Sequence, residues 1–398
     1  MKAYFAKKAL LNSWSTPIGR RGMVEIVPPD LRPSRDLLPP PLSLLSEMAI
    51  PSDLSAKAIY NLSCLRLPDP FNSSHFNPSS FIPLYDETTA PPSIPIPPPV
   101  TDEEELHPDV PMYLVGSTYD VKEMEEFCGR HPICILRAKE GEGSLFNINL
   151  DLFSTVNLLS IAPDHPVEVR QQPRQDPDYY NVDKKSGMPT WRFKSAKFDK
   201  DLTLTEHAAY QEKCHQREQA VKDEEKKSKQ AEDDGIPRKK RKIYEPKTLR
   251  FGTNVDLSTE EMFKRHRKEL KKMPSFCGVN RPNDMLRHVG YQVLGMNTVQ
   301  VYLKVGGART PAHIENNCIG SVNINVGPGE CEWFGVDYKY WSVIDNELKE
   351  QDIDFLSDSW WPNYVDLTKK LGVPTYRFNQ KVGDVVVVGP GCVHWVQS

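Results

Sequence analysis

The sequence predicts a mainly β protein with added helices, preceded by an arm that is mostly disordered. Stretches in the second half of the chain alternate apolar and polar residues with the period of a β-strand. Gly-Pro-Gly turns follow two of them, at 327–329 and 389–391. Residues 1–100 hold 18 of the 35 prolines and show no sustained helical or strand period, which predicts a Pro-rich arm without regular structure.

The charge balance excludes some classes of protein. The 398 residues include 50 basic and 54 acidic side chains, for a formal net charge of −4. Proteins that coat nucleic acid need many cations against phosphate, so we expect no sequence-specific DNA binding. The longest apolar run, around Val385–Val388, is far shorter than the roughly 20 residues of a membrane helix. The charged N-terminal residues also differ from a signal peptide, so no membrane contact is expected.

The cysteines point to a reducing compartment. The 8 cysteines include no Cys-x-x-Cys pair. Neither a zinc ribbon nor a disulfide framework is therefore indicated, and free thiols in the cytosol or the nucleus are expected.

Globular patterning begins after the arm, and residues 101–206 are expected to form the N-terminal part of the folded region. Apolar residues recur on one helical face within 117–128, which predicts a helix capped by Ser117 or Thr118. The apolar run Ile133–Leu136 predicts a strand directly after it.

Residues 207–247 predict a charged linker that loops out of the folded region. Nearly every residue in this segment is charged or polar, so it cannot bury much apolar surface. Within it, Pro237–Lys242 (PRKKRK) has five consecutive cations. This run is typical of a nuclear import signal, although a solvated charge run has the same composition.

Residues 248–398 predict the main β-rich core. Ser258 and Glu261 match a capping box at the start of a helix over 258–273, which Pro274 ends. Two further helices are expected near 340–350 and 363–371.

The strands of this core carry polar residues on one face. Within Thr298–Val305 the apolar residues share one face, and Tyr302 and Lys304 lie on the other. Within Ser321–Val326, Ser321 and Asn323 likewise share the polar face. Such faces are candidates for a site, although a surface strand would show the same alternation.

Two histidines and a glutamate suggest a metal site. His313 and Glu315 project from the same face if the backbone between them is extended, and His394 follows the second Gly-Pro-Gly turn in a short strand. Three ligands on one side of a metal leave the other side open, as in non-haem Fe(II) oxygenases. Zinc is the competing metal, although the helical His-Glu-x-x-His pattern of zinc hydrolases does not occur.

The motifs around these residues resemble a known family. The principal matching stretches are GARTPAHIENN (Gly307–Asn317), SVNINVGPGECEWF (Ser321–Phe334), SWWPNYVDL (Ser359–Leu367) and PGCVHWVQ (Pro390–Gln397). They closely resemble the JmjC histone demethylases of the UTX type, which act on methylated lysine 27 of histone H3, and the resemblance covers about 103–398.

The resemblance implies a double-stranded β-helix, or jelly roll, flanked by helices, and it implies a set of site residues. The Fe(II) ligands would be His313, Glu315 and His394. The residues that match positions contacting the co-substrate 2-oxoglutarate are Lys304, Thr310, Ser321 and Asn323. Tyr302 matches a position that lines the methyl-lysine pocket, so it is the candidate residue for contact with the reacting group.

The resemblance also implies an activity and a setting. The activity is an oxidative demethylation that uses Fe(II), 2-oxoglutarate and O₂, helped by ascorbate in vitro, and releases formaldehyde. No nitrogen lone pair is needed, so trimethyl-lysine is an allowed substrate. The implied partners are the histone H3 tail and chromatin complexes, and the implied location is the nucleus.

The sequence departs from the family at its end. Relatives continue past the position of His394 with a further strand and a four-cysteine zinc module, so residues 248–398 are expected to form a core that lacks these parts. A second interpretation therefore stands beside the enzyme: a catalytically inactive chromatin protein that acts through partners.

Overall fold

The computed structural model describes most of the chain from Ile96 onward. The residues described are 96–398 without 176, 177, 179, 184, 234–245, 259, 280, 282–283, 285, 288–291 and 294. The Pro-rich arm up to residue 95 and the basic run Pro237–Lys242 therefore lie outside the described residues. Within the described part of the chain, no helix is long and apolar enough to span a membrane.

The chain divides into two units. Ser93–Gly278 and Thr298–Ser398 form the first, which contains every strand described below. Lys2–Pro92 and Val279–Asn297 form the second. In the described part of the second unit, the Asn297 side chain accepts a hydrogen bond from the backbone N–H of Val293 at 2.7 Å and so closes a turn.

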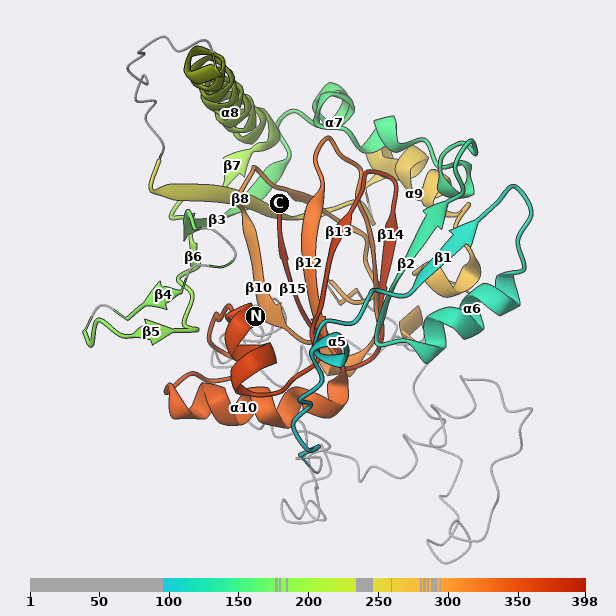
Figure 1. Cartoon of the computed structure of the whole chain (residues 1–398). Coiled ribbons are helices and arrows are strands. Elements are labelled where there is room, and N and C mark those ends of the chain that lie inside the picture. The colour runs from blue at the N-terminus through green and yellow to red at the C-terminus, as the bar shows by residue number, and fades with distance from the viewer. Residues whose placement is uncertain are drawn as a thin grey trace, which may run out of the picture. The chain divides into compact units, whose positions relative to one another are not determined.

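Two four-stranded sheets form the double-stranded β-helix that the sequence predicts (Figure 1). The first sheet is antiparallel, and its order is β10 (Arg309–His313), β15 (Val393–Gln397), β12 (Cys331–Val336) and β13 (Tyr376–Gln380). The order of the second sheet is β1 (Met112–Val115), β2 (Ile133–Ala138), β14 (Val385–Val388) and β11 (Ser321–Ile324). A buried cluster joins them, with Ile133, Ile135, Val386 and Val388 from the second sheet and Trp333 and Val396 from the first.

A third sheet extends the fold beside these two. Its order is β6 (Ala196–Lys197), β3 (Pro166–Pro173), β8 (Thr248–Asp256) and β9 (Gln300–Leu303), and β7 (Leu202–Thr203) also pairs with β3. A short separate hairpin consists of β4 (Asn181–Val182) and β5 (Pro189–Thr190). A strand was predicted over Thr298–Val305, and β9 confirms it for the central residues of that range.

Helices cover the outer faces of the sheets. The α-helices are α5 (Glu103–Leu106), α6 (Val121–Arg130), α7 (Thr155–Ile161), α8 (Leu204–Asp233), α9 (Lys264–Leu270) and α10 (Trp341–Glu350). Met124 and Cys128 of α6 pack in the same cluster as Cys134 and Leu136 of β2. Successive side chains of a strand point to opposite faces, so Ile133 and Ile135 of β2 face the inside of the β-helix. The strand is therefore buried on both faces.

Two predicted helices differ from the structure at their starts. The first, α6, begins at Val121, because the Asp120 carboxylate accepts hydrogen bonds from the N–H groups of Lys122 and Glu123. Neither Ser117 nor Thr118 caps it, so that prediction is wrong. The capping box at Ser258 is also wrong, because the Ser258 hydroxyl accepts from the backbone N–H of Val299 at 2.8 Å.

The predicted helix over 258–273 is therefore shorter and begins with a tighter turn. A 3₁₀ turn over Glu261–Phe263 leads into α9. The helix predicted near 340–350 is confirmed by α10. The one predicted near 363–371 is a helical turn of π type over Asp366–Lys370.

The largest difference concerns the segment predicted as a charged linker. Residues 204–233 form the 30-residue helix α8, so the prediction of a loop is wrong there (Figure 1). His207 and Cys214 are buried in an otherwise polar helix. Together with Tyr210 they recur at spacings of three and four residues, which places them on one helical face. This narrow stripe holds the helix on the sheet although its composition is that of a solvated segment.

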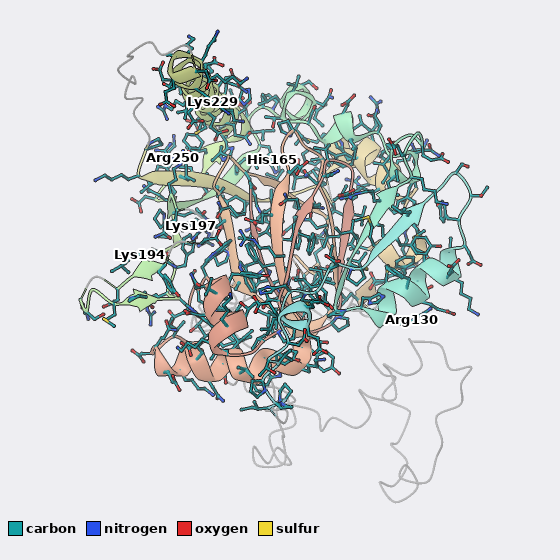
Figure 2. All side chains as sticks on the ribbon, in the orientation of Figure 1. Arg130, His165, Lys194, Lys197, Lys229 and Arg250 are labelled. Atoms are coloured by element: carbon teal, nitrogen blue, oxygen red, sulfur yellow. The ribbon has the colours of Figure 1, made fainter. Side chains whose placement is uncertain are left out.

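Three contacts connect α8 with β8 and with the residue that follows β9. The Tyr210 hydroxyl accepts a hydrogen bond from the N–H of Arg250 at 2.9 Å. The Gln211 side-chain amide donates to the carbonyl of Lys304 at 2.8 Å. Cys214 packs in a cluster that includes Phe251. Arg250 lies on β8 beside α8, with its guanidinium 5.6 Å from the Tyr210 ring centre (Figure 2).

We expect Tyr210→Phe to lower the free energy of unfolding by about 1 kcal/mol, because the N–H of Arg250 loses its acceptor. Urea denaturation followed by circular dichroism measures this change. Lys213→Ala, on the exposed side of the same helix, is the matched control and should change stability by less than about 0.5 kcal/mol. Equal effects of the two variants would contradict the docking of α8 through Tyr210.

We also expect His207 to make stability depend on pH. The pKa of His207 is lowered from 6.5 to about 4, mainly by burial; the Gln211 side chain opposes this shift and the charge of Arg250 favours it. Between pH 6.5 and 4 the unfolded chain therefore binds a proton that the folded chain does not, so stability falls as the pH falls. This group alone contributes about 3 kcal/mol over that window.

Urea unfolding at a series of pH values tests this expectation. The curve for His207→Leu should fall less steeply than the parent curve between pH 6.5 and 4. Parallel curves for the two proteins would show that His207 does not carry the effect.

Candidate metal centre

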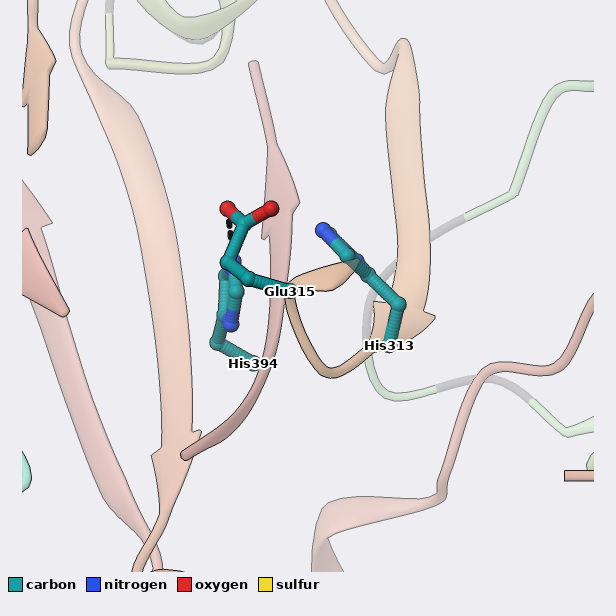
Figure 3. Close-up of side chains that lie close together, drawn as sticks. All are labelled: His313, Glu315 and His394. Atoms are coloured by element: carbon teal, nitrogen blue, oxygen red, sulfur yellow. Dashed lines mark ion pairs between the residues drawn. The ribbon is translucent and has the colours of Figure 1, made fainter. Parts of the chain in front are cut away.

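The structure brings His313, Glu315 and His394 together (Figure 3). One ligand atom from each lies within 4.8 Å of the others. Nε2 of His394 is 3.6 Å from Oε1 of Glu315, and the two imidazole centroids are 4.3 Å apart. Among the described residues, these three form the one group of His, Cys, Asp or Glu side chains that lie close enough together to hold a metal ion.

Strand pairing explains why these side chains meet. In the antiparallel pair of β10 and β15, His313 lies directly opposite His394, and opposite residues in such a pair project from the same face. Glu315 follows β10 with an extended backbone, at φ −65° and ψ 152°, so it projects toward the same side. The extended His-x-Glu geometry that the sequence predicts is confirmed.

Backbone carbonyls orient both imidazoles. Nδ1 of His313 lies 2.9 Å from the carbonyl oxygen of Pro311, and Nδ1 of His394 lies 3.1 Å from that of Cys392. A carbonyl oxygen only accepts hydrogen bonds, so Nδ1 carries the proton in each ring. Each Nε2 is left with a free lone pair, which is the form that a metal needs.

The surroundings keep His313 neutral. Its pKa is lowered to about 3, mainly by burial and also by the neighbouring His394, while Glu315 opposes the shift. The Trp333 ring stacks on His394 with centroids 5.9 Å apart and an angle of 12°, which holds that imidazole in place. Two neutral imidazoles and one carboxylate suit a divalent transition metal.

Polar side chains from both sheets face the same interior. Thr310 lies opposite Val396, Ser321 opposite Val388, and Asn323 opposite Val386. All three valines belong to the core between the two sheets. Because opposite residues share a face, the three predicted co-substrate residues point into the β-helix and not to solvent.

Lys304, which is half-buried, supplies a cation. Burial lowers the pKa of its ammonium group, and the nearby Cys331 thiol opposes this shift. Its Nζ lies 5.3 Å from the centre of the Phe251 ring. Among the described residues, no carboxylate lies within ion-pair distance of it. A partly desolvated ammonium group without a carboxylate partner is suited to binding an anion.

Tyr302 lies on β9 and packs beside Phe251 of β8. Its ring packs 5.9 Å from that of Phe251, and its hydroxyl donates to Oε1 of Gln300 at 3.3 Å. Both Tyr302 and Lys304 therefore lie over Phe251. The structure places Tyr302 beside the Lys304 end of the site, and its methyl-lysine role stays a prediction.

Sequence reasoning missed two buried polar residues. Gln380 is 1% exposed and Arg309 is 0% exposed. Gln380 shares a face of β13 with Tyr376 and Phe378, which pack on the interior cluster, so a polar residue on that apolar face was the available signal. Arg309 carries no such signal, because its partner Gln172 lies 137 positions away in the chain.

The fold and this donor set define a class of protein: a double-stranded β-helix with a two-histidine, one-carboxylate site inside. Residues 300–398 match the family model described as JmjC domain, hydroxylase. The chain is 38% identical to human lysine-specific demethylase 6B over 305 residues, which are 74% of this chain. It is 45% identical to lysine-specific demethylase jmjd-3.1 of Caenorhabditis elegans over 150 residues, which are 38% of this chain. Residues 300–398 therefore form a domain of the JmjC family.

The relatives are much longer proteins. The aligned regions cover 18% of the human protein and 14% of the nematode protein. The similarity therefore concerns the JmjC region of those proteins and the residues that precede it.

We expect His313→Ala to weaken Mn(II) binding by about a hundredfold or more, because the site loses one of three ligands. Mn(II) is a suitable probe because it accepts nitrogen and oxygen ligands, and its electron paramagnetic resonance signal reports the bound fraction. His215→Ala, which changes an exposed histidine on α8, should bind Mn(II) like the parent. Unchanged affinity in His313→Ala would exclude this residue as a ligand.

Proposed function

We propose that this chain is an Fe(II)- and 2-oxoglutarate-dependent demethylase of methylated lysine 27 of histone H3. The observation that carries the proposal is the position of His313, Glu315 and His394 on the inner face of the β-helix. The two demethylase relatives support the reaction class. The resemblance of its motifs to the UTX type supports the choice of lysine 27.

The three ligand residues would hold Fe(II) through two Nε2 atoms and one carboxylate. Bound there, Fe(II) supplies the activation of O₂ that hydroxylates an N-methyl group, which is then lost as formaldehyde. The contribution of the protein is to orient these groups and to exclude water. The carbonyls of Pro311 and Cys392 keep both histidines in the ligating form.

The interior polar residues fit a dicarboxylate co-substrate. The ammonium group of Lys304 would pair with one carboxylate of 2-oxoglutarate, because charge-assisted hydrogen bonds are the strong ones. Thr310, Ser321 and Asn323 offer hydroxyl and amide groups on the same interior face. Binding an anion would also relieve the cost of keeping Lys304 buried.

The histone tail is the proposed substrate, and Tyr302 is the proposed contact for the methylated side chain. An aromatic face attracts a methylammonium group. Residues 101–206 and 248–398 are proposed to form the catalytic region together. We propose that the protein acts in the nucleus, with Pro237–Lys242 as its import signal. Chromatin complexes are the proposed partners.

We expect the protein to remove methyl groups from an H3 peptide trimethylated at lysine 27. The peptide is incubated with the protein, Fe(II), 2-oxoglutarate and ascorbate, and mass spectrometry follows the stepwise loss of methyl groups. His313→Ala should show no loss, because it lacks a metal ligand. A peptide trimethylated at lysine 4 tests the choice of lysine.

Two results would contradict parts of the proposal. Equal turnover of the two peptides would remove the lysine 27 assignment and leave the demethylase. No turnover by folded protein that binds Mn(II) and 2-oxoglutarate would instead favour a chromatin protein that acts through partners.

A further inference from the structure

Gln380 connects the two sheets of the β-helix through hydrogen bonds. It lies on β13, and its side chain is buried at 1% exposure. Its Oε1 accepts a hydrogen bond from Nε1 of Trp333 at 2.8 Å. Its Nε2 donates to Oδ1 of Asn323 at 3.1 Å, to the carbonyl of Asn323 at 3.2 Å and to the carbonyl of Asp384 at 3.1 Å.

The chemistry of these partners fixes the orientation of the Gln380 amide. The indole N–H of Trp333 only donates, so the atom that faces it must be the oxygen. The carbonyls of Asn323 and Asp384 only accept, so the atom that faces them must be the nitrogen. Both ends of the amide are thus determined by groups that cannot change roles.

The orientation of Gln380 in turn fixes that of Asn323. Because Nε2 of Gln380 is a donor, the Asn323 atom that faces it must be the oxygen, Oδ1. The Asn323 NH₂ group is then the part of the amide left for another partner. Among the residues that the structure describes, this NH₂ group has no hydrogen-bond acceptor. Asn323 therefore presents a donor within the interior.

This chain of hydrogen bonds begins beside the metal residues. The same Trp333 that donates to Gln380 stacks on the ring of His394. The face of the Trp333 ring thus packs on a candidate ligand histidine, and its N–H determines the orientation of the Gln380 amide. We call the hydrogen-bonded series Trp333, Gln380 and Asn323 the relay.

We propose that Gln380 is a positioning residue that makes Asn323 a hydrogen-bond donor to a carboxylate of the co-substrate. This inference rests on the proposed function, which supplies 2-oxoglutarate as the ligand. A carboxylate only accepts hydrogen bonds, so Asn323 in the reversed orientation would place an oxygen against it and repel it. Gln380 favours the productive orientation without touching the ligand.

Isothermal titration calorimetry of the full chain loaded with Mn(II) tests the proposal without relying on turnover. Gln380→Met keeps the length of the side chain and removes the amide. We expect it to weaken 2-oxoglutarate binding by about tenfold, with Mn(II) affinity unchanged. Gln351→Met is the matched control, because the Gln351 side chain also accepts a hydrogen bond from a tryptophan, in this case from the backbone N–H of Trp191 at 2.7 Å, away from Asn323. It should bind 2-oxoglutarate like the parent.

A double-mutant cycle separates positioning from general loosening. In an Asn323→Ala background the amide to be oriented is gone, so Gln380→Met should then have no further effect on 2-oxoglutarate affinity. If Gln380→Met does not fold, Trp333→Phe addresses the same relay from its other end. It keeps a ring for His394, removes the N–H, and should weaken 2-oxoglutarate binding by a smaller factor.

The outcomes are distinguishable. A parent protein that binds Mn(II) but no 2-oxoglutarate would overturn the proposed function, and this inference with it. A parent that binds 2-oxoglutarate, with Gln380→Met equal to it in affinity, would overturn this inference alone. A Gln380→Met effect that persists undiminished in the Asn323→Ala background would also overturn it.

Discussion

The pairing of β10 with β15 is the constraint on which the metal centre depends. It places His313 opposite His394, and the extended residues after β10 bring Glu315 to the same side. A shift of either strand by one residue would turn its histidine to the other face. The register is held by the valine and tryptophan core between the two sheets, so the packing that stabilises the fold also determines the geometry of the ligands.

The second sheet completes the site because it faces the first across that core. Ser321 and Asn323 on β11 are held by pairing with β14, opposite Val388 and Val386. Gln380 then ties Asn323 to the first sheet through Trp333. A hydrophobic core can keep two sheets apart at a fixed distance, but it does not decide which end of an amide faces the interior. Directional hydrogen bonds between buried groups supply that information.

Among the strands described, the sequence predicted β2, β9, β11 and β15, because a strand has a period of two. The candidate ligand His394 lies on one of these strands. The prediction failed at α8, because the charged composition of 207–233 outweighed the three anchors His207, Tyr210 and Cys214. It also failed at the cap of α6, where Asp120 lies only two or three residues beyond the expected caps. Gln380 could be recognised as unusual from its strand, but its partner Asn323 is 57 positions away, and only the fold shows that they meet.

The charged helix also belongs to the site energetically. Gln211 of α8 donates to the carbonyl of Lys304, and the cluster that holds Cys214 contains Phe251, over which the Lys304 ammonium lies. Covering a cation with apolar side chains destabilises its charged form, and the lowered pKa of Lys304 reflects this cost. A helix that only stabilised the sheet would not need to reach this residue. These contacts place α8 against the backbone of Lys304 and against Phe251, so a segment that resembles a linker supports the part of the fold that holds this candidate co-substrate residue.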